Sequence, residues 1–176
     1  MTLGAVLAGG QSSRFGSDKA LAMLDGQTLL TRAVKTLAPW CDAVVVVGRD
    51  EAPAPTIPDW PRAHMGPLGG IAAALRHGAS TGHSEVLTCG VHSVGLPDDL
   101  PARLAPAPAY LADQPVVGLW PASAASAVAA ILDGTGKHSL RALAERLGAR
   151  AVTLDTNPAN INTPADLANL ENRDGV

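Results

Sequence analysis

Residues 2–19 read TLGAVLAGGQSSRFGSDK, a short apolar run that leads directly into a loop rich in glycine and serine. The apolar run, residues 2–7, is typical of a buried strand, and it stops at Gly9 and Gly10. Because glycine has no side chain, backbone N–H groups in such a loop can approach phosphate oxygens closely. The pattern predicts an anion-binding loop at the end of the first strand.

Two cations of the same loop, Arg14 and Lys19, supply positive charge next to these glycines. Lysine is rare here, since only three of the 13 basic residues are lysines, and the net charge of the chain is −3. A chain of that charge is not drawn to nucleic acid or to a membrane surface, so an anionic ligand must be bound locally. The loop lacks both the G-K-[ST] ending of a Walker A motif and the G-x-G-x-x-G of a Rossmann fold.

The composition predicts one domain over residues 1–176 with an aliphatic core, since 47% of the residues are hydrophobic and only 3% are aromatic. Two cysteines, Cys41 and Cys89, lack C-x-x-C spacing, so we expect neither a disulfide framework nor a cysteine-based zinc site. The N-terminus lacks a basic segment followed by a long apolar run, and no segment approaches the ~20 apolar residues of a membrane helix. We therefore expect a cytoplasmic protein without nucleic-acid or membrane partners.

Short β-branched runs alternate with longer segments rich in alanine and leucine along the chain. Two proline-rich segments, PAPT at 53–56 and PAPAY at 106–110, are expected to be surface loops. The alternation favours a three-layer α/β/α sandwich with a mostly parallel sheet, in which ligands gather beyond the carboxyl ends of the strands. After the first strand, the pattern predicts strands at 43–47, 85–89, 115–119 and 151–154, and helices at 28–37, 67–79, 122–132, 139–147 and from 164 onward.

The glycine loop resembles the L-A-G-G-x-S-x-R-[MF]-G-x-D-K signature of the MobA-like nucleotidyltransferases, the molybdenum cofactor guanylyltransferase family. Three further segments are similar to motifs of that family and follow in its order: MGPLGGI at 65–71, GLWP at 118–121 and NINTPADL at 160–167. The resemblance runs from about residue 3 to residue 170, which is nearly the whole chain. It implies a fold like that of the nucleotide-diphospho-sugar transferases.

For function, the resemblance implies transfer of GMP from GTP to the terminal phosphate of molybdopterin, with release of pyrophosphate. It also implies partners among the proteins that make the molybdenum cofactor and those that accept it. Carried over motif by motif, the resemblance implies nucleotide-binding backbone at Leu7, Ala8, Gly9 and Gly10 and a nucleoside contact at Asp59. It implies catalytic cations at Arg14 and Lys19, and Lys19 is also expected to bind the nucleotide. Contacts to the second substrate are implied at Asn160 and Asn162.

One position departs from the family, which has C-D-T-P-F-L-P after its third strand and holds Mg²⁺ through that aspartate. Here residues 91–97 read VHSVGLP, so His92 stands at the position of the metal-binding carboxylate. Mg²⁺ takes oxygen ligands, so the Mg²⁺ that the family implies is expected to bind weakly or to be replaced by Mn²⁺. Three interpretations of His92 are open: a ligand for a softer divalent ion, a cation that contacts phosphate, or a polar residue at a site that no longer catalyses efficiently.

Other polar residues have structural interpretations. Asp98 and Asp99 could serve as substitute metal carboxylates, but we expect them to cap the start of a helix, where acidic side chains are favourable. Asn162 or Thr163 is expected to cap the last helix. The remaining histidines show no common spacing, so we expect no metal binding at His64, His77, His83 and His138.

Two alternatives to a guanylyltransferase are open. A cytidylyltransferase, or another NTP transferase with the same loop, would share these motifs, because base choice depends on a few contacts in the pocket. A non-catalytic nucleotide-binding relative would keep the fold and lack the metal chemistry at His92. In either enzyme, the segment with Ser139 and Arg141 is expected to reach a phosphate of the acceptor.

Overall fold

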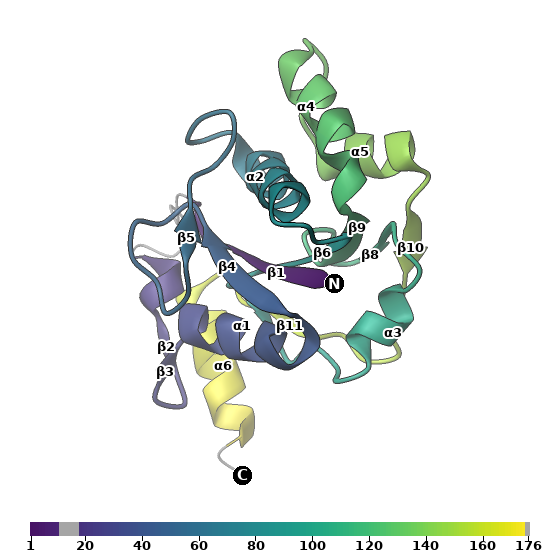
Figure 1. Ribbon diagram of the computed structural model, residues 1–176. Helices are drawn as coiled ribbons and strands as arrows, with labels where there is room; N and C mark the ends of the chain where they lie inside the picture. The colour runs from purple at the N-terminus through teal and green to yellow at the C-terminus, as the bar shows by residue number, and fades with distance from the viewer. Residues whose placement is uncertain (11–17, 175–176) are drawn as a thin grey trace.

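The computed structural model describes residues 1–10 and 18–174, and Figure 1 shows a central sheet with helices on both of its faces. Within this part of the chain the main sheet has seven strands in the order β10-β8-β9-β6-β1-β4-β5. Neighbouring strands are parallel except that β9 is antiparallel to both β6 and β8, which confirms the expected mostly parallel α/β/α sandwich. The strands are β1 (Thr2–Leu7), β4 (Ala43–Val47), β5 (Thr56–Ile57), β6 (Glu85–Gly90), β8 (Ala109–Leu111), β9 (Gly118–Pro121) and β10 (Arg150–Val152).

The helices form two groups, one on each face of the sheet (Figure 1). None of the described helices is both long and apolar enough to cross a membrane. One face carries α2 (Gly66–Ser80), α4 (Ala125–Asp133) and α5 (Leu140–Leu147), and the other carries α1 (Leu29–Leu37), α3 (Leu100–Leu104) and α6 (Pro164–Asp174). The smaller elements are the 3-10 helices η1 (Lys19–Leu21), η2 (Ala38–Trp40) and η3 (Ala122–Ala124), and the paired short strands β2 (Met23–Leu24) with β3 (Gln27–Thr28) and β7 (Ser93–Val94) with β11 (Ala159–Asn160).

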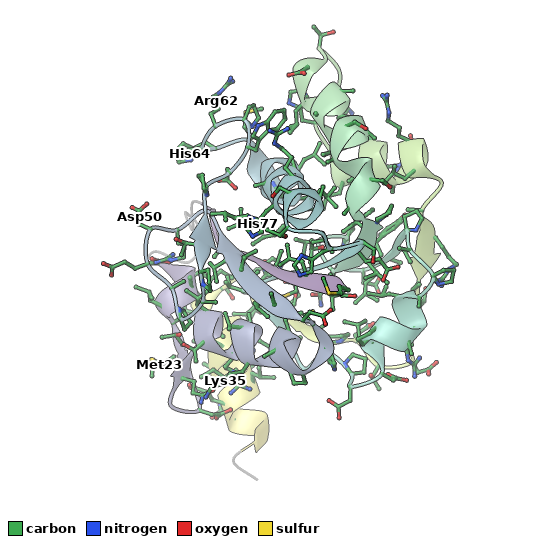
Figure 2. The ribbon with its side chains drawn as sticks, in the orientation of Figure 1. Met23, Lys35, Asp50, Arg62, His64 and His77 are labelled. Carbon is green, nitrogen blue, oxygen red and sulfur yellow. The ribbon has the colours of Figure 1, made fainter. Side chains whose placement is uncertain are left out.

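Two apolar clusters hold the layers together, one between the sheet and each group of helices. Successive residues of β1 alternate between them, since Ala5 belongs to the cluster under α2 and Val6 to the cluster under α1. Small residues bring α2 close to the sheet: a Cβ at Gly78 would lie 2.9 Å from the Val86 side chain. Figure 2 shows side chains filling both layers, while Lys35 and Asp50 lie exposed at the surface.

The register of the sheet brings three strand ends together. Leu7, the last residue of β1, pairs with Val47 of β4 on one side and with Gly90 of β6 on the other. The loops that follow these three strands therefore leave the sheet side by side. This is the edge at which parallel sheets bind ligands.

The structure differs from the sequence-based expectations around the middle of the chain. The proline-rich segment expected to be a loop contains β8, which pairs with both β9 and β10. The strand expected at 115–119 begins only at Gly118, because residues 114–117 form a turn in which the Val117 N–H donates to the Gln114 carbonyl at 2.8 Å. The short strand β8 was not predicted because it follows prolines at 106 and 108, which lack backbone N–H donors and are therefore uncommon in strands. The other proline-rich segment is also not entirely a loop, because its last residue, Thr56, begins the short strand β5. The two-residue strands β2, β3, β7 and β11 were not expected either, whereas the longer helices and strands lie close to the expected ranges.

Candidate functional site

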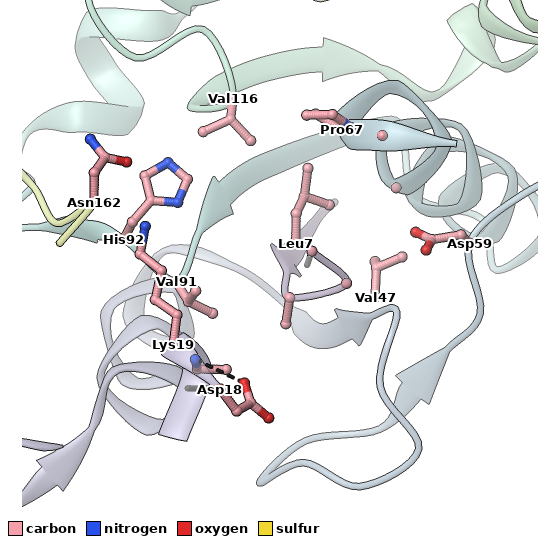
Figure 3. Close-up of a pocket in the computed structure, with 16 residues that line it drawn as sticks. Leu7, Asp18, Lys19, Val47, Asp59, Pro67, Val91, His92, Val116 and Asn162 are labelled. Carbon is pink, nitrogen blue, oxygen red and sulfur yellow. Dashed lines mark hydrogen bonds between the residues drawn. The ribbon is translucent and has the colours of Figure 1, made fainter. Parts of the chain in front are cut away.

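A cavity of about 330 Å³ lies where the loops after β1, β4 and β6 meet (Figure 3). Segments far apart in the sequence contribute to it, from the first strand to the loop before α6. It brings together most of the residues singled out in the sequence: Leu7, Ala8, Gly9, Gly10, Lys19, Asp59, His92 and Asn162. Arg14 lies outside the described residues, and Asn160 lines a neighbouring cavity instead.

The glycines of the first loop are needed for a close approach between two strand ends. A Cβ at Gly9 would lie 2.9 Å from the Gly48 Cα and 3.0 Å from the Asp59 Oδ2. Gly48 itself has a φ of +84°, a conformation that favours glycine. By contrast, a Cβ at Gly10 would meet no atom of the described residues within 4 Å. The described part of the chain is therefore tightly packed at Gly9 and leaves room beside Gly10.

This contrast defines a matched pair of variants. We expect Gly9→Ala to lower the free energy of unfolding by about 1–3 kcal/mol, because the new methyl group collides with backbone that cannot move aside. Gly10→Ala should leave the free energy of unfolding nearly unchanged. Urea denaturation followed by tryptophan fluorescence measures both values. Equal stabilities for the two variants would contradict the close packing described here.

Asp59 forms one end of the cavity. Its carboxylate lies against Gly9, Gly48 and Gly70, and a Cβ at Gly70 would be 3.5 Å from its Oδ1. Within the described residues, no hydrogen bond reaches this carboxylate, and burial raises its pKa while the charge of His64 acts in the opposite direction. A partly buried carboxylate without a donor is able to accept hydrogen bonds from a bound molecule.

Lys19 lies on the other side of the cavity, at the start of η1, and Figure 3 shows its side chain directed towards His92 and Asn162. Burial lowers the pKa of its ammonium group, and the negative charge of Asp166 opposes that effect. Figure 3 also shows Lys19 and Asp59 on opposite sides of Leu7. The cavity is therefore polar at two ends, with a cation at one and a carboxylate at the other.

Asp18 and Arg49 fix the backbone from which Lys19 extends. The Asp18 carboxylate accepts hydrogen bonds from both terminal nitrogens of Arg49, at 3.0 and 2.7 Å, and from the Ala20 N–H at 3.2 Å. Hydrogen bonding to Arg49 lowers the pKa of Asp18 and keeps it charged. Arg49 was not among the site residues predicted from the sequence. It could have been predicted from its position two residues after the end of β4, because that strand ends beside β1.

His92 follows β6 and lies directly against the strand end. A Cβ at Gly90 would be 2.8 Å from the His92 Nδ1, so the imidazole occupies the space that a side chain there would need. The His92 carbonyl accepts a hydrogen bond from the Ile161 N–H at 3.0 Å. Burial, and secondarily the charge of Lys19, lowers the pKa of His92 to about 4. The imidazole is therefore neutral near pH 7, and contact with phosphate as a cation is not expected there.

The residues around His92 do not fit a magnesium ion. Mg²⁺ requires several oxygen ligands in a near-octahedral arrangement, and a neutral imidazole beside a lysine ammonium offers neither the oxygen nor the charge. In the described part of the chain, no three His, Cys, Asp or Glu side chains are grouped as metal ligands. The nearby Asp18 is occupied by Arg49, and Asp59 lies at the far end of the cavity (Figure 3).

The segment before α6 closes the site from the side of β6. Its strand β11 pairs with β7, which places Asn160 opposite Ser93. The Asp166 carboxylate accepts hydrogen bonds from the N–H groups of Asn162 and Thr163 at 2.9 and 2.8 Å, and these bonds lower its pKa. The Thr163 hydroxyl accepts the Asp166 N–H in return, which makes Thr163 one of the two expected caps. Asn162 is thereby held at the cavity.

A second and larger cavity, of about 860 Å³, lies beside the first. Three residues line both cavities: Pro67, His92 and Val116. The second cavity extends from them towards the turn after β8 and towards α5, and Asn160 lies on its wall. Its other lining residues include Leu68, Tyr110, Ala112, Ser139, Leu140 and Arg141.

The remaining sequence-based interpretations concern residues away from the first cavity. Asp99 precedes α3 without capping it through its side chain, and its carboxylate instead pairs with Arg103 at 2.8 Å. Asp99 therefore stands at the N-cap position of α3, as a capping residue would, but it makes no capping hydrogen bond through its side chain. Trp120 is fully buried and donates its Nε1–H to the Thr88 hydroxyl at 3.0 Å, so it packs in the core.

The mostly parallel sheet, with a glycine loop, a lysine and a carboxylate at one carboxyl edge, defines a nucleotide-binding α/β protein. Residues 4–153 match the family model described as the MobA-like NTP transferase domain, and the chain belongs to that family. It is similar to the molybdenum cofactor guanylyltransferase of Acidiphilium cryptum, with 37% identity over 92% of this chain and 90% of that protein. The protein of the same name from Rhodobacter capsulatus is 36% identical over 97% of this chain and 95% of its own.

A solved structure agrees with this assignment at the level of the fold. It is the crystal structure of molybdopterin-guanine dinucleotide biosynthesis protein A from Archaeoglobus fulgidus, which matches with a TM-score of 0.78. The match covers 99% of both chains at 23% sequence identity. The chain therefore shares its overall fold with that protein.

Proposed function

We propose that this protein transfers GMP from GTP to the terminal phosphate of molybdopterin and releases pyrophosphate. The names of the curated relatives support this activity. The observation that carries it is the polarity of the first cavity, which has the Asp59 carboxylate at one end and the Lys19 ammonium at the other. A nucleoside triphosphate has a matching polarity, because its base can donate hydrogen bonds and its phosphates carry negative charge.

The Asp59 carboxylate favours guanine among the common bases. Guanine presents two neighbouring N–H donors, N1–H and the 2-amino group, and a carboxylate can accept both at once. Cytosine and adenine present an amino group beside an unprotonated ring nitrogen, and the lone pair of that nitrogen would face a carboxylate oxygen. In a partly buried site, such a mismatch lowers affinity strongly. This chemistry favours a guanylyltransferase over the cytidylyltransferase alternative.

The glycine loop and Lys19 would hold the phosphates. Leu7, Ala8, Gly9 and Gly10 line the cavity, and a Cβ at Gly10 would meet no atom of the described residues within 4 Å. Lys19 adds a charge at the end directed towards His92 and Asn162 (Figure 3). Arg14, whose position in this loop is outside the described residues, is proposed to add a second charge.

Catalysis in this arrangement consists of positioning and charge neutralisation. An oxygen of the acceptor phosphate attacks the α-phosphorus of GTP in line with the bond to the β-phosphate. The new P–O bond forms as that bond breaks, and pyrophosphate leaves with its electron pair. The acceptor phosphate already carries its attacking lone pair, so the step needs neither a covalent intermediate nor a protein base.

Nucleotidyltransferases of this family typically use a divalent cation. Because the residues at His92 do not fit Mg²⁺, we propose that a cation, Mg²⁺ or Mn²⁺, is bound mainly by phosphate oxygens of the nucleotide. The partners proposed with it are GTP, molybdopterin and other proteins of molybdenum cofactor biosynthesis. The role of Lys19 is independent of that cation, because its charge belongs to the chain itself.

A nucleotide screen tests the proposal. Pyrophosphate release is measured with GTP, CTP, ATP and UTP, each with and without molybdopterin and with Mg²⁺ or Mn²⁺. We expect release with GTP that depends on molybdopterin. Release with CTP alone would replace the guanylyltransferase by a cytidylyltransferase. Binding of GTP without release under either metal would identify a non-catalytic relative.

A further inference from the structure

The Asp59 carboxylate receives no hydrogen bond from the part of the chain that the structure describes, so its direction has to be set by packing. A side chain that recognises a ligand at two points must be held within about 10–20° of the productive direction. Glycines enclose the carboxylate: a Cβ would lie 3.0 Å from its Oδ2 at Gly9 and 3.5 Å from its Oδ1 at Gly70. These contacts limit where the carboxylate lies, and the backbone from which it extends determines the rest.

Trp60, the next residue, joins that backbone to the start of α2. The Trp60 N–H donates to the Gly69 carbonyl, in the first turn of the helix, at 3.2 Å. A Cβ at Gly69 would lie 3.2 Å from the Trp60 carbonyl oxygen, so the absence of a side chain there lets the two backbones approach. Because this N–H belongs to the peptide bond between Asp59 and Trp60, the contact restricts the backbone that carries the carboxylate.

The Trp60 ring is attached to the same helix further along. Arg76 follows Gly69 by seven residues, which places it on the same face of α2 and roughly 10 Å along the helix axis. The Arg76 guanidinium carbon lies 4.5 Å from the centroid of the Trp60 ring, a distance typical of a cation–π contact. The ring is half-buried against the apolar cluster under α2, and Arg76 is exposed. Trp60 is therefore held at two separate points of one helix.

We propose that Trp60 and Arg76 form a positioning pair, which holds the Asp59 carboxylate in the direction needed to accept both N–H donors of guanine. This inference rests on the proposed function, in which Asp59 recognises the base. Among the described residues that line the first cavity, neither Trp60 nor Arg76 is present, so both act through Asp59. Their two attachments to α2 resist a rotation of the 59–60 peptide that would turn the carboxylate away from the base.

The charge of Arg76 does not act on either end of the cavity directly. Within the described residues, no ion pair joins Arg76 to Asp59. Lys19, at the end proposed for the phosphates, lies on the opposite side of the cavity from Asp59 (Figure 3). The effect of Arg76 on nucleotide binding therefore passes through the Trp60 ring.

A comparison of GTP with inosine triphosphate measures the direction of Asp59. Hypoxanthine keeps the N1–H of guanine and lacks the 2-amino group, so we expect the wild type to bind GTP about 10-fold more tightly. Arg76→Gln removes the cation from an exposed helical position, and we expect it to weaken GTP binding about 5-fold and inosine triphosphate binding less than 2-fold. Arg76→Lys keeps a cation and should recover most of that loss. Titration calorimetry measures each affinity.

A double-mutant cycle separates positioning from a general structural role. Trp60→Leu keeps an apolar side chain without the ring, and we expect it to weaken GTP binding about 20-fold. In an Asp59→Ala background, Trp60→Leu and Arg76→Gln should each change GTP affinity less than 2-fold, because no carboxylate remains to be oriented. Thermal unfolding shows whether each variant is folded. If Trp60→Leu is not folded, the cycle with Arg76→Gln gives the same comparison.

Arg62, exposed in the loop after Trp60 and directed outward in Figure 2, provides the control Arg62→Gln. It removes an equal charge nearby, and we expect both nucleotides to bind within 2-fold of the wild type. Equal losses in Arg62→Gln and Arg76→Gln would indicate a charge effect and overturn the positioning pair. Losses of GTP affinity that persist in the Asp59→Ala background would overturn it as well.

The same measurements distinguish failure of this inference from failure of the proposed function. Losses that persist without Asp59, in a protein that releases pyrophosphate from GTP in the presence of molybdopterin, would overturn the positioning pair alone. Losses that require Asp59, in a protein that releases no pyrophosphate, would leave the positioning pair assigned and overturn the transfer. A wild-type protein that binds no GTP would overturn both.

Discussion

Replacement of Lys19 by methionine is expected to weaken GTP binding about 100-fold. Methionine is similar in length and fits a partly buried position, so the variant removes the ammonium charge while the apolar stem remains. A charge-assisted hydrogen bond to phosphate contributes roughly 1.5–3 kcal/mol, which corresponds to about 10- to 150-fold in affinity. The upper part of this range applies because Lys19 is partly shielded from solvent, and burial already lowers the pKa of its free ammonium group. Titration calorimetry with GTP measures the change.

Lys35 provides the matched control for this experiment. It is exposed on α1, away from the cavity, so Lys35→Met removes an equal charge without touching the site (Figure 2). We expect its GTP affinity to remain within 2-fold of the wild type. A Lys19→Met variant that is folded, as judged by its thermal unfolding, and that binds GTP normally would show that the phosphates are held elsewhere. Equal losses in both variants would indicate a general charge effect.

The sequence was informative where local chemistry determines structure. The glycine pair after β1 could be assigned to a ligand loop, because an apolar run followed by glycines and a lysine is typical of a strand that ends at a phosphate site. The start of the last helix could also be predicted, since the expected cap Thr163 accepts the Asp166 N–H at 3.2 Å through its hydroxyl. Parallel pairing of the first strands followed from their alternation with helices.

Contacts between residues far apart in the chain could not be predicted from local sequence patterns. The pair between Asp18 and Arg49 joins residues that are 31 positions apart, and nothing local in either segment indicates the other. The short strand β8 was hidden by the prolines before it, and the pairing with β9 and β10 that defines it is set by the sheet as a whole. Val116 likewise reaches the cavity through a distant contact, because its carbonyl accepts a hydrogen bond at 2.7 Å from the Thr88 hydroxyl of β6, which is 28 positions away.

Replacement of Asp59 by asparagine is expected to exchange the base preference of the site. A carboxamide offers one acceptor and one donor where the carboxylate offers two acceptors. Xanthine has an N1–H donor and, in place of the 2-amino group of guanine, an oxygen acceptor, so it complements asparagine as guanine complements aspartate. We expect Asp59→Asn to lose about 100-fold in GTP affinity and to gain affinity for xanthosine triphosphate. Calorimetric titration with both nucleotides measures this exchange.

Stability distinguishes a lost base contact from a damaged fold. Burial raises the pKa of Asp59 in the folded protein, so its charged form opposes folding at neutral pH, and that cost is relieved as pH falls. Asparagine carries no charge, so Asp59→Asn should unfold at the same temperature as the wild type or higher while GTP affinity falls. Asp50→Asn, at an exposed position, should alter neither the unfolding temperature nor the GTP affinity (Figure 2).

An Asp59→Asn variant that loses GTP affinity without gaining affinity for xanthosine triphosphate would show that Asp59 supports the pocket but does not recognise the base. Unchanged GTP affinity in that variant would show that Asp59 does not contact the nucleotide. A carboxylate that costs stability and is nevertheless present at the end of the cavity is what a residue selected for base recognition would look like.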